Sequence, residues 1–375
     1  MRALLFLISL GIAAASCAQS ANPLAPPVAA KSYLLLDYHS QQLLVSQNVN
    51  ERIEPASLTK LMTAYLTFSA LKRQQIQPTQ VVPVSERAWK AEGSRMFIEP
   101  RKPVTVDELM RGMIVQSGND ACIALAELIA GSEEAFAQLM NREAQRLGMK
   151  NTHFVNSTGL PNPQHYSAAY DLALLAIAIV RDFPEYHPLY SMKEFRYNNI
   201  TQANRNRLLW SDPAVDGMKT GYTENAGYCL ITSAKRGGRR LISVVLGAAS
   251  EAARAAESQN LLNYGFQFYD SVKLYEKNQP VASLRVWKGS GNSVKAGFLN
   301  DLYVSLPKGQ ADKLKANLES RQPMFAPISA GQKIGVMKLT LDGNPYAELP
   351  VVALETVSPA GIFGRGWDSI RLLFK

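Results

Sequence analysis

The sequence has few cysteines and few histidines. Its 375 residues include 3 cysteines and 4 histidines, and the histidines are scattered along the chain. We predict no metal site, because protein metal sites gather several such ligands at short, regular spacings. Cys17 lies near the N-terminus, which leaves Cys122 and Cys229 as a pair that could form one disulfide. Both lie in apolar segments, where free cysteine behaves as a small hydrophobic residue, so we favour two free buried thiols.

The sequence also lacks internal repeats, low-complexity tracts and nucleic-acid-binding motifs. Nothing in it therefore predicts a nucleic acid as partner. Hydrophobic residues make up 47% of the chain, as in an ordinary globular protein, and 375 residues are enough for two domains. The formal net charge of +9 suits an anionic surface, either phospholipid or cell-wall polymer.

One apolar run is long, and it stands at the N-terminus. A positive start precedes residues 3–15, which are apolar almost throughout, and Ser16-Cys17-Ala18 then supplies the small residues typical of a signal-peptidase site. We predict a signal peptide over residues 1–18 and an exported protein. One alternative is a permanent anchor, although the run is too short to cross a bilayer comfortably. The other is a lipoprotein site at Cys17, although Ala14 stands where such sites usually have a larger aliphatic residue.

Apolar residues recur at helical spacing up to residue 269. The predicted helices cover residues 57–71, 106–115, 119–130, 133–147, 171–180 and 251–269. Strand patterns form two hairpins, one over residues 32–47 and one that joins 228–234 to 241–248 through Arg236-Gly237-Gly238. Because hairpins connect these strands, we predict an antiparallel sheet with helices packed on it, over residues 31–275.

Beyond a predicted linker at residues 276–280, the helical spacing stops and short strands follow. These strands cover residues 281–287, 302–306, 334–341 and 347–354, and Asp342-Gly343 marks a hairpin turn. We predict a small all-β domain over residues 279–355. The predicted fold class is therefore α+β, with a helix-and-sheet domain followed by an all-β domain.

Ser57-Leu58-Thr59-Lys60 opens the first predicted helix with a hydroxyl and an amine at positions i and i+3. Residues at that spacing share one helical face and can hydrogen-bond. A serine hydroxyl is a weak nucleophile until a neighbouring base removes its proton. A lysine can be that base where burial or nearby positive charge leaves its amine partly neutral. The same motif occurs at residues 305–308, but there it contains Pro307 and lies in a β context.

Two further short motifs follow in order. Ser117-Gly118-Asn119 precedes another predicted helix, and Lys219-Thr220-Gly221 precedes the β region. Each is weak alone, since Ser290-Gly291-Asn292 repeats the first in a predicted loop. In this order and context, the three motifs resemble the signature of class A β-lactamases and penicillin-binding proteins.

The longer stretches around these motifs are similar to the low-molecular-mass D-alanyl-D-alanine carboxypeptidases. The similar stretches are residues 55–63, 117–122, 165–171, 204–210, 216–223, 254–258 and 361–365. The resemblance implies a β-lactamase-like peptidase fold, no cofactor, a peptidoglycan pentapeptide as substrate and β-lactam antibiotics as covalent inhibitors. It also implies a location on the periplasmic face of the cytoplasmic membrane.

The resemblance implies a role for each catalytic motif. Ser57 would attack the carbonyl between the two D-alanines, with Lys60 as the general base. Ser117 would relay a proton to the leaving amine. Lys219 would keep the local field positive, and Asn119 would hydrogen-bond the peptide.

The resemblance also implies a set of substrate-binding groups. The backbone N–H groups of Ser57 and Tyr222 would form the oxyanion hole, next to Gly221 on the same strand. Thr220 and Arg254 would hold the terminal carboxylate of the peptide. The family often has histidine where this chain has Tyr222, so the resemblance implies no side-chain role at that position.

Each of these residues also has a purely structural interpretation. The structural alternatives are a helix cap at Ser57, turn residues at Ser117 and Asn119, a surface lysine at Lys219 and a solvated arginine at Arg254. We interpret His165 as structural, because no serine–histidine–acid triad can be argued from its position. We expect Asp171 and Arg205 to form a structural ion pair.

The C-terminus carries an amphipathic pattern. The apolar stripe consists of Phe363, Trp367, Ile370 and Phe374, and the cationic residues off it are Arg365, Arg371 and Lys375. A short cationic amphipathic helix can lie in a membrane interface, so we predict a membrane-anchoring tail over residues 358–375. The alternative is a helix packed on the all-β domain.

Three other functions remain open. A β-lactamase is disfavoured by the extra β domain and by Gly118, which stands where class A enzymes carry aspartate. D,D-endopeptidase action on cross-links is a closer alternative that only substrate tests can separate. A non-catalytic scaffold bound to the cell wall is disfavoured because all the motif residues are intact.

Overall fold

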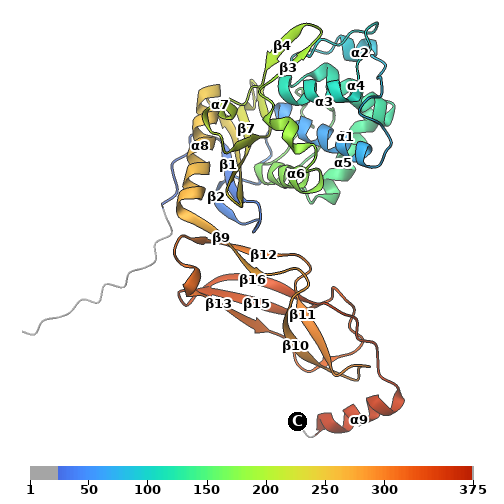
Figure 1. Ribbon diagram of the computed structural model, residues 1–375, viewed down its shortest axis with the longest axis vertical. Coiled ribbons are helices and arrows are strands. Elements are labelled where there is room, and N and C mark those ends of the chain that lie inside the picture. Colours follow the sequence, from blue (N-terminus) through green and yellow to red (C-terminus); the bar gives the residue numbers. More distant parts are fainter. Residues whose placement is uncertain (1–23, 374–375) are drawn as a thin grey trace, which may run out of the picture.

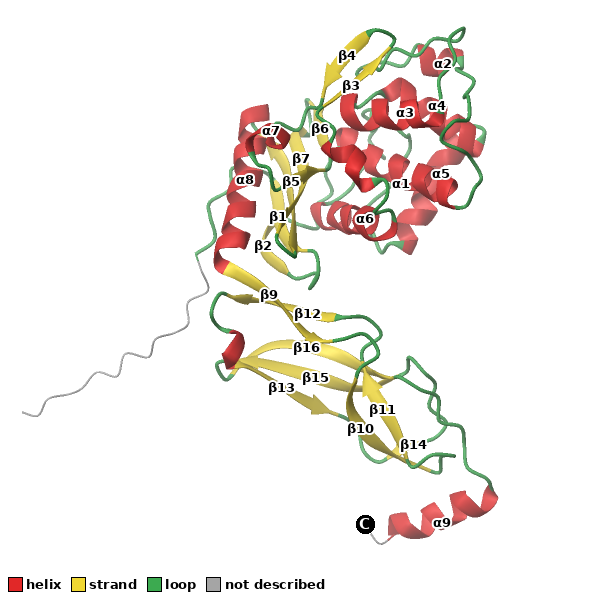
Figure 2. Cartoon of the chain, in the orientation of Figure 1, coloured by secondary structure: helices red, strands yellow, loops and turns green. Residues whose placement is uncertain are grey.

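The computed structural model describes residues 24–373, which form two units placed end to end (Figure 1). The predicted signal peptide over residues 1–18 and Phe374 of the predicted tail lie outside the described residues. Helices and a sheet make up the first unit, and the second, called the β unit below, consists almost entirely of strands (Figure 2). The predicted α+β class is confirmed.

The predicted helices of the first unit all form. Its helices are α1 (Lys60–Lys72), α2 (Glu86–Trp89), α3 (Val106–Arg111), α4 (Asn119–Ala130), α5 (Glu133–Arg146), α6 (Ala169–Asp182), α7 (Leu208–Ser211) and α8 (Glu251–Phe268). A 3-10 turn, η1 (Ala56–Thr59), precedes α1, and a π-helical turn, η2 (Gly112–Gln116), follows α3. The short helices α2 and α7 were not predicted, because four residues are too few to show a helical period.

The first unit is built on an antiparallel sheet, as the hairpin signals predicted. Its strands are β1 (Ser32–Asp37), β2 (Leu43–Gln47), β5 (Val215–Gly217), β6 (Thr220–Thr223), β7 (Gly227–Arg236) and β8 (Arg239–Ala248), with β3 (Glu194–Tyr197) and β4 (Ile200–Ala203) in a separate hairpin. The sheet order is β2-β1-β8-β7-β5, and β6 pairs with β7.

Both faces of this sheet are covered. Successive side chains of a strand point to opposite faces. Leu34 and Leu36 of β1 therefore join a core with α1, α4 and α6, while Tyr33 and Leu35 join a second core with α8. Figure 2 shows the same layers, with α7 and α8 on one side of the sheet and α1 to α6 opposite. The central strands lie between the two cores, and β6, which carries Thr220 and Gly221, pairs with the central strand β7.

The β unit begins earlier than the predicted linker. Its strands are β9 (Tyr269–Tyr275), β10 (Pro280–Trp287), β11 (Ser293–Gly297), β12 (Leu302–Pro307), β13 (Leu314–Glu319), β14 (Met324–Phe325), β15 (Lys333–Leu341) and β16 (Asn344–Ala353). The sequence pattern predicts residues 269–275 in the first domain, but β9 pairs with β12, and Val272 and Leu274 pack on the core of the β unit. This strand follows α8 directly, so residues 276–279 of the predicted linker only connect β9 to β10, and Pro280 begins β10.

The last helix, α9 (Ile362–Leu373), lies at the end of the β unit opposite the first unit (Figure 1). Within residues 24–373, no helix is both long and apolar enough to cross a bilayer. Cys122 and Cys229 are free and buried, which confirms the preferred interpretation of the two thiols.

Candidate active site

Ser57 and Lys60 meet at the start of α1. The Lys60 Nζ donates a hydrogen bond to the Ser57 Oγ at 2.9 Å and another to the Thr158 carbonyl oxygen at 2.6 Å. Ser57 makes no side-chain capping bond, since Pro55 is the N-cap of η1 and Thr59 that of α1. The interpretation of Ser57 as a helix cap is therefore wrong. Its hydroxyl is directed instead to the amine of Lys60.

The surroundings of Lys60 make it a better base than an exposed lysine. Its side chain is only 1% exposed. Burial lowers the pKa of its ammonium to about 8, because a charged amine is poorly solvated there, and the positive charge of Arg205 acts in the same direction. An appreciable fraction of Lys60 is therefore neutral near neutral pH. A neutral amine next to Ser57 can accept the serine proton.

The π-helical turn η2, which packs against α1, has Ser117 as its C-cap. Ser117 has a left-handed backbone (φ 67), and its Oγ is buried with no hydrogen-bond partner among the described residues. A Cβ at residue 118 would lie 2.8 Å from the Asp120 Oδ1 and 3.2 Å from the Met96 amide nitrogen, so glycine avoids crowding at the middle position. This crowding gives a physical reason why Gly118 replaces the aspartate of class A β-lactamases.

Asn119 begins α4, and one of the two polar atoms of its side chain is hydrogen-bonded. Its Nδ2 donates to the Glu92 carbonyl at 2.6 Å, while its Oδ1 is buried without a partner in the described part of the chain. A buried, unpaired amide oxygen is costly unless a ligand supplies a donor. The amide is thus held in one orientation with an acceptor left over, which fits the predicted hydrogen bond to the peptide.

Lys219 is buried, so its interpretation as a surface lysine is wrong. Its side chain is 3% exposed, and its Nζ donates to the Thr220 carbonyl at 2.9 Å. Burial lowers the pKa of Lys219 well below its ordinary value, and the charges of Lys60 and Arg205 add to that effect. Two lysines therefore share one poorly solvated region around the serine.

Strand β6 forms the wall next to η1. A Cβ at residue 221 would lie 3.2 Å from Leu58 Cγ, so glycine lets the strand approach the turn that holds Ser57. Within the described residues β6 pairs only with β7, which leaves its other edge for an extended peptide. Tyr222 is half exposed, and its ring centroid lies 4.4 Å from that of Tyr228.

Arg254 fixes this strand from α8. Its Nη1 donates to the Gly221 carbonyl at 3.2 Å, and its Nη2 lies 3.3 Å from the Glu251 carboxylate. The side chain is 3% exposed, so the interpretation of Arg254 as a solvated residue is wrong. A buried guanidinium behind Gly221 adds positive charge beside Thr220, where the terminal carboxylate of a peptide is expected.

Comparison with known proteins identifies the family of this chain. A family model described as D-alanyl-D-alanine carboxypeptidase matches residues 18–250, and one described as the C-terminal domain of penicillin-binding protein 5 matches residues 269–359. The chain belongs to the D-alanyl-D-alanine carboxypeptidase family. The predicted resemblance is thereby confirmed.

Individual relatives of this carboxypeptidase family cover most of the chain. The D-alanyl-D-alanine carboxypeptidase DacC of Escherichia coli is 43% identical over 358 residues, which are 93% of this chain and 90% of the relative. The solved structure of penicillin binding protein 5 from Haemophilus influenzae has a TM-score of 0.86 and 41% identity, covering 90% of this chain and 99% of that one. Penicillin-binding protein D2 from Listeria monocytogenes, solved in an ampicillin-bound form, has a TM-score of 0.60 and 29% identity. The match covers 65% of this chain and 100% of that one.

The sequence did not reveal one part of this carboxypeptidase site, the loop at residues 156–159. Its Thr158 carbonyl holds the Lys60 amine, and the Asn156 Oδ1 accepts the backbone N–H groups of Thr158 and Gly159. Gly159 has φ 84, and a Cβ there would lie 1.8 Å from the Ala56 carbonyl oxygen. The run Asn-Ser-Thr-Gly is a turn signal that could have drawn attention to this loop.

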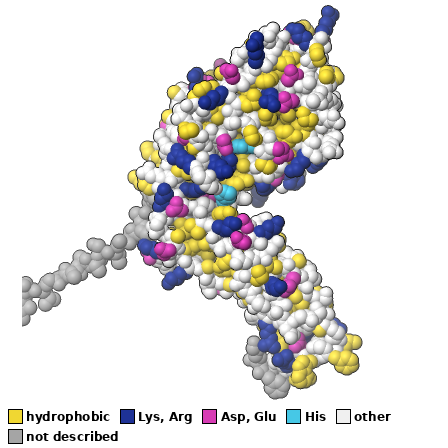
Figure 3. Space-filling model, viewed as in Figure 1, with side chains coloured by type: hydrophobic (Ala, Val, Ile, Leu, Met, Phe, Trp, Pro, Cys, Tyr) yellow, Lys and Arg dark blue, Asp and Glu magenta, His cyan; other side chains and the backbone are white. Residues whose placement is uncertain are grey.

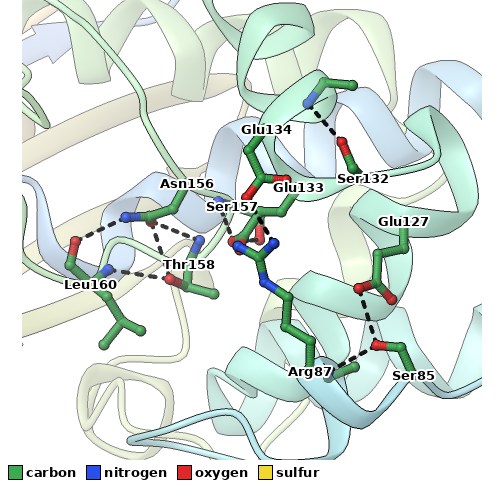
Figure 4. A network of polar contacts seen from close by, with 12 residues as sticks. Ser85, Arg87, Glu127, Ser132, Glu133, Glu134, Asn156, Ser157, Thr158 and Leu160 are labelled. Atoms are coloured by element: carbon green, nitrogen blue, oxygen red, sulfur yellow. Dashed lines mark hydrogen bonds and ion pairs between the residues drawn. The ribbon is translucent and has the colours of Figure 1, made fainter.

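A buried carboxylate supports the loop from α5 (Figure 4). The Glu133 Oε1 accepts the Ser157 backbone N–H at 2.9 Å and the Ser157 hydroxyl at 2.6 Å, and its Oε2 lies 2.6 Å from the Arg87 guanidinium. Glu133 is 4% exposed. The carboxylate therefore orders the residue that precedes Thr158, and no sequence pattern connected these distant positions.

The expected ion pair between Asp171 and Arg205 is wrong. Asp171 accepts the Asn151 backbone N–H and the Thr152 hydroxyl, both at 2.7 Å, and makes no ion pair with Arg205 in the described structure. Arg205 is exposed, and its charge lowers the pKa values of Lys60 and Lys219. The sequence did not indicate this electrostatic effect of Arg205 on the two lysines.

His165 is structural, as interpreted from the sequence. Its Nδ1 accepts the Val155 backbone N–H, so its Nε2 carries the proton and donates to the Thr59 hydroxyl at 2.7 Å. Burial lowers the pKa of His165 to about 4, which keeps the ring neutral. The described residues contain no group of three or more histidine, cysteine or acidic side chains that could hold a metal.

Proposed function

We propose that Ser57 is the nucleophile of a D,D-carboxypeptidase and that Lys60 is its general base. The observation that carries this proposal is the 2.9 Å hydrogen bond between the buried Lys60 amine and the Ser57 hydroxyl. Neutral Lys60 takes the proton of Ser57 as its oxygen attacks the carbonyl between the two D-alanines. The C–N bond then breaks, D-alanine leaves, and an ester on Ser57 remains for water to hydrolyse.

The surrounding groups stabilise the charges of this reaction. The free Ser117 Oγ passes a proton to the leaving amine, and Lys219 keeps the local potential positive. The backbone N–H groups of Ser57 and Tyr222 bind the developing oxyanion. The unpaired Asn119 Oδ1 accepts a peptide N–H.

The preference for a free C-terminus follows from the wall formed by β6. Thr220 and the buried charge of Arg254 hold the terminal carboxylate, while Gly221 lets the strand lie against η1. The substrate is the peptidoglycan pentapeptide. A β-lactam imitates its D-alanyl-D-alanine end and acylates Ser57 in the same way. No cofactor takes part.

Endopeptidase action is the second candidate, because the free edge of β6 would also accept a peptide that continues beyond the second D-alanine. The test uses the mature protein and Ser57→Ala with a fluorescent penicillin and with a peptide ending in D-alanyl-D-alanine. We expect labelling and D-alanine release that both vanish in Ser57→Ala. Labelling without release, together with cleavage of a cross-linked dimer, would favour the endopeptidase, and absence of labelling would contradict the serine mechanism.

We also propose that the protein is exported by residues 1–18 and bound to the periplasmic face of the cytoplasmic membrane by the tail at 358–375. The support is the exposure of the apolar side chains of α9. These are Ile362, Phe363, Trp367 and Ile370, with exposed fractions of 78%, 94%, 62% and 50%. A helix packed on the β unit would cover this stripe. Truncation at residue 361 should release the protein from a membrane fraction into the soluble fraction.

A further inference from the structure

The helix α9 is joined to the distal end of the β unit. The Lys288 backbone N–H, just after β10, donates to the Asp368 Oδ2 at 2.6 Å, and the Ala360 N–H donates to the Lys288 carbonyl at 2.8 Å. Leu372 lines a cavity of about 580 Å³ together with Arg285 and Trp287. The helix and the ends of β10 and β14 therefore form one continuous surface, called the distal surface below.

The β-unit part of the distal surface combines cations with aromatic rings. The Arg285 guanidinium lies 3.9 Å from the centroid of the Trp287 ring, and the Lys288 ammonium lies 5.8 Å from that of Phe325. Parallel pairing of β10 with β14 sets Trp287 beside Phe325, and Phe325 is 45% exposed. Aromatic and basic side chains combined in this way are typical of proteins that contact the headgroup region of a bilayer.

The charge of the distal surface is positive. Arg365 and Arg371 of α9 add to Arg285 and Lys288, and Figure 3 shows dark-blue and yellow side chains together at this end of the molecule. Within α9 as described, Asp368 is the only carboxylate, and its bond to the Lys288 backbone N–H partly satisfies it. Negative charge is therefore the complement of this surface.

The partner must also cover apolar side chains. A membrane with anionic phospholipids offers both a hydrocarbon layer and negative headgroups. An anionic cell-wall polymer offers charge alone and would leave Phe363 and Trp367 in water. These two requirements together favour an anionic bilayer.

We propose that Arg285 and Lys288 of the β unit bind anionic lipid headgroups, so that the membrane contact consists of α9 and the end of the β unit together. The proposal rests on the proposed anchoring by α9. It adds a selectivity that anchoring by apolar burial alone would not give. It also sets α9 across the end of the β unit, since the bond between Asp368 and Lys288 holds the helix there.

The test compares co-sedimentation of the full mature protein with vesicles of phosphatidylcholine alone and with vesicles that contain phosphatidylglycerol. Arg285→Gln/Lys288→Gln should lower partitioning into the anionic vesicles by up to about thirtyfold, because each basic side chain near the surface contributes about fivefold. Partitioning into neutral vesicles should change little. The matched control is Lys308→Gln/Lys315→Gln, which removes two exposed lysines of the β unit outside the distal surface and should retain wild-type binding.

Two results would overturn the inference. One is equal binding of wild type and Arg285→Gln/Lys288→Gln to anionic vesicles. The other is that Arg285→Gln/Lys288→Gln still binds vesicles but no longer binds anionic cell-wall polymer, which would identify the polymer as the partner of this surface. A failure of the proposed anchoring by α9 would give a different result. In that case the chain truncated at residue 361, which lacks α9, would sediment with vesicles to the same extent as wild type. Penicillin labelling of each variant checks that the protein is folded.

Discussion

The two units differ in what they bury. The first unit buries charged side chains, including Lys60, Lys219 and Arg254, each 3% exposed or less. In the described residues after 269, Ser305 is the only polar or charged side chain in the buried class, and its hydroxyl lies 2.7 Å from that of Ser40 in the first unit. Burying charge costs free energy unless partners compensate. The comparison shows that only the first unit buries charged side chains at a cost in free energy, and this burial is what lowers the pKa of Lys60.

The two Ser-x-x-Lys motifs offer the largest test of this difference. Lys60→Gln should lower the acylation rate by about a thousandfold or more, because it removes the base that accepts the Ser57 proton. Lys308→Gln, in the second motif, should leave the rate unchanged, since Lys308 is exposed after β12. The measurement is the second-order rate constant for labelling by a fluorescent penicillin. Equal losses in both variants would contradict the assignment of the base.

Glycines in the two units should respond differently to a methyl group. Gly159→Ala should lower the free energy of unfolding by about 3 kcal/mol or more, because the Cβ would overlap the Ala56 carbonyl oxygen. Gly343→Ala, at φ 80 with open space around it, bears only the backbone cost of about 1 to 2 kcal/mol. Urea denaturation measures both. A smaller loss for Gly159→Ala than for Gly343→Ala would show that the loop at 156–159 can move aside.

The smallest expected effect concerns the pH at which the enzyme works. Because burial lowers the pKa of Lys60 to about 8, the acylation rate should rise about tenfold per pH unit below pH 7 and level off above pH 8. Arg205→Gln removes a charge that lowers this pKa, so the midpoint should move to higher pH. Labelling rates across a pH series measure it. A midpoint that stays in place would remove Arg205 from the electrostatics of the site.

The sequence was informative where neighbours along the chain decide the structure. The pairing of Ser57 with Lys60 is set by one turn of helix, and the hairpin from β7 to β8 is set by Gly237 and its neighbours, so both could be predicted. The support of Lys60 by the Thr158 carbonyl could not, because it depends on a backbone atom far along the chain. The partners of Asp171 and the pairing of β9 are likewise decided by tertiary packing, which no short-range pattern encodes.

The direct passage from α8 into β9 has a consequence for where this enzyme can act. The helix ends at Phe268 and the strand starts at Tyr269, and the Ser271 hydroxyl donates to the buried Asp37 at 3.3 Å. Because the strand follows the helix directly, the β unit holds Ser57, the proposed nucleophile, at a set height above whatever surface binds its far end. Together with the proposed surface binding, this geometry leads us to expect cleavage of peptides within that layer of the cell wall and not of those nearer or farther.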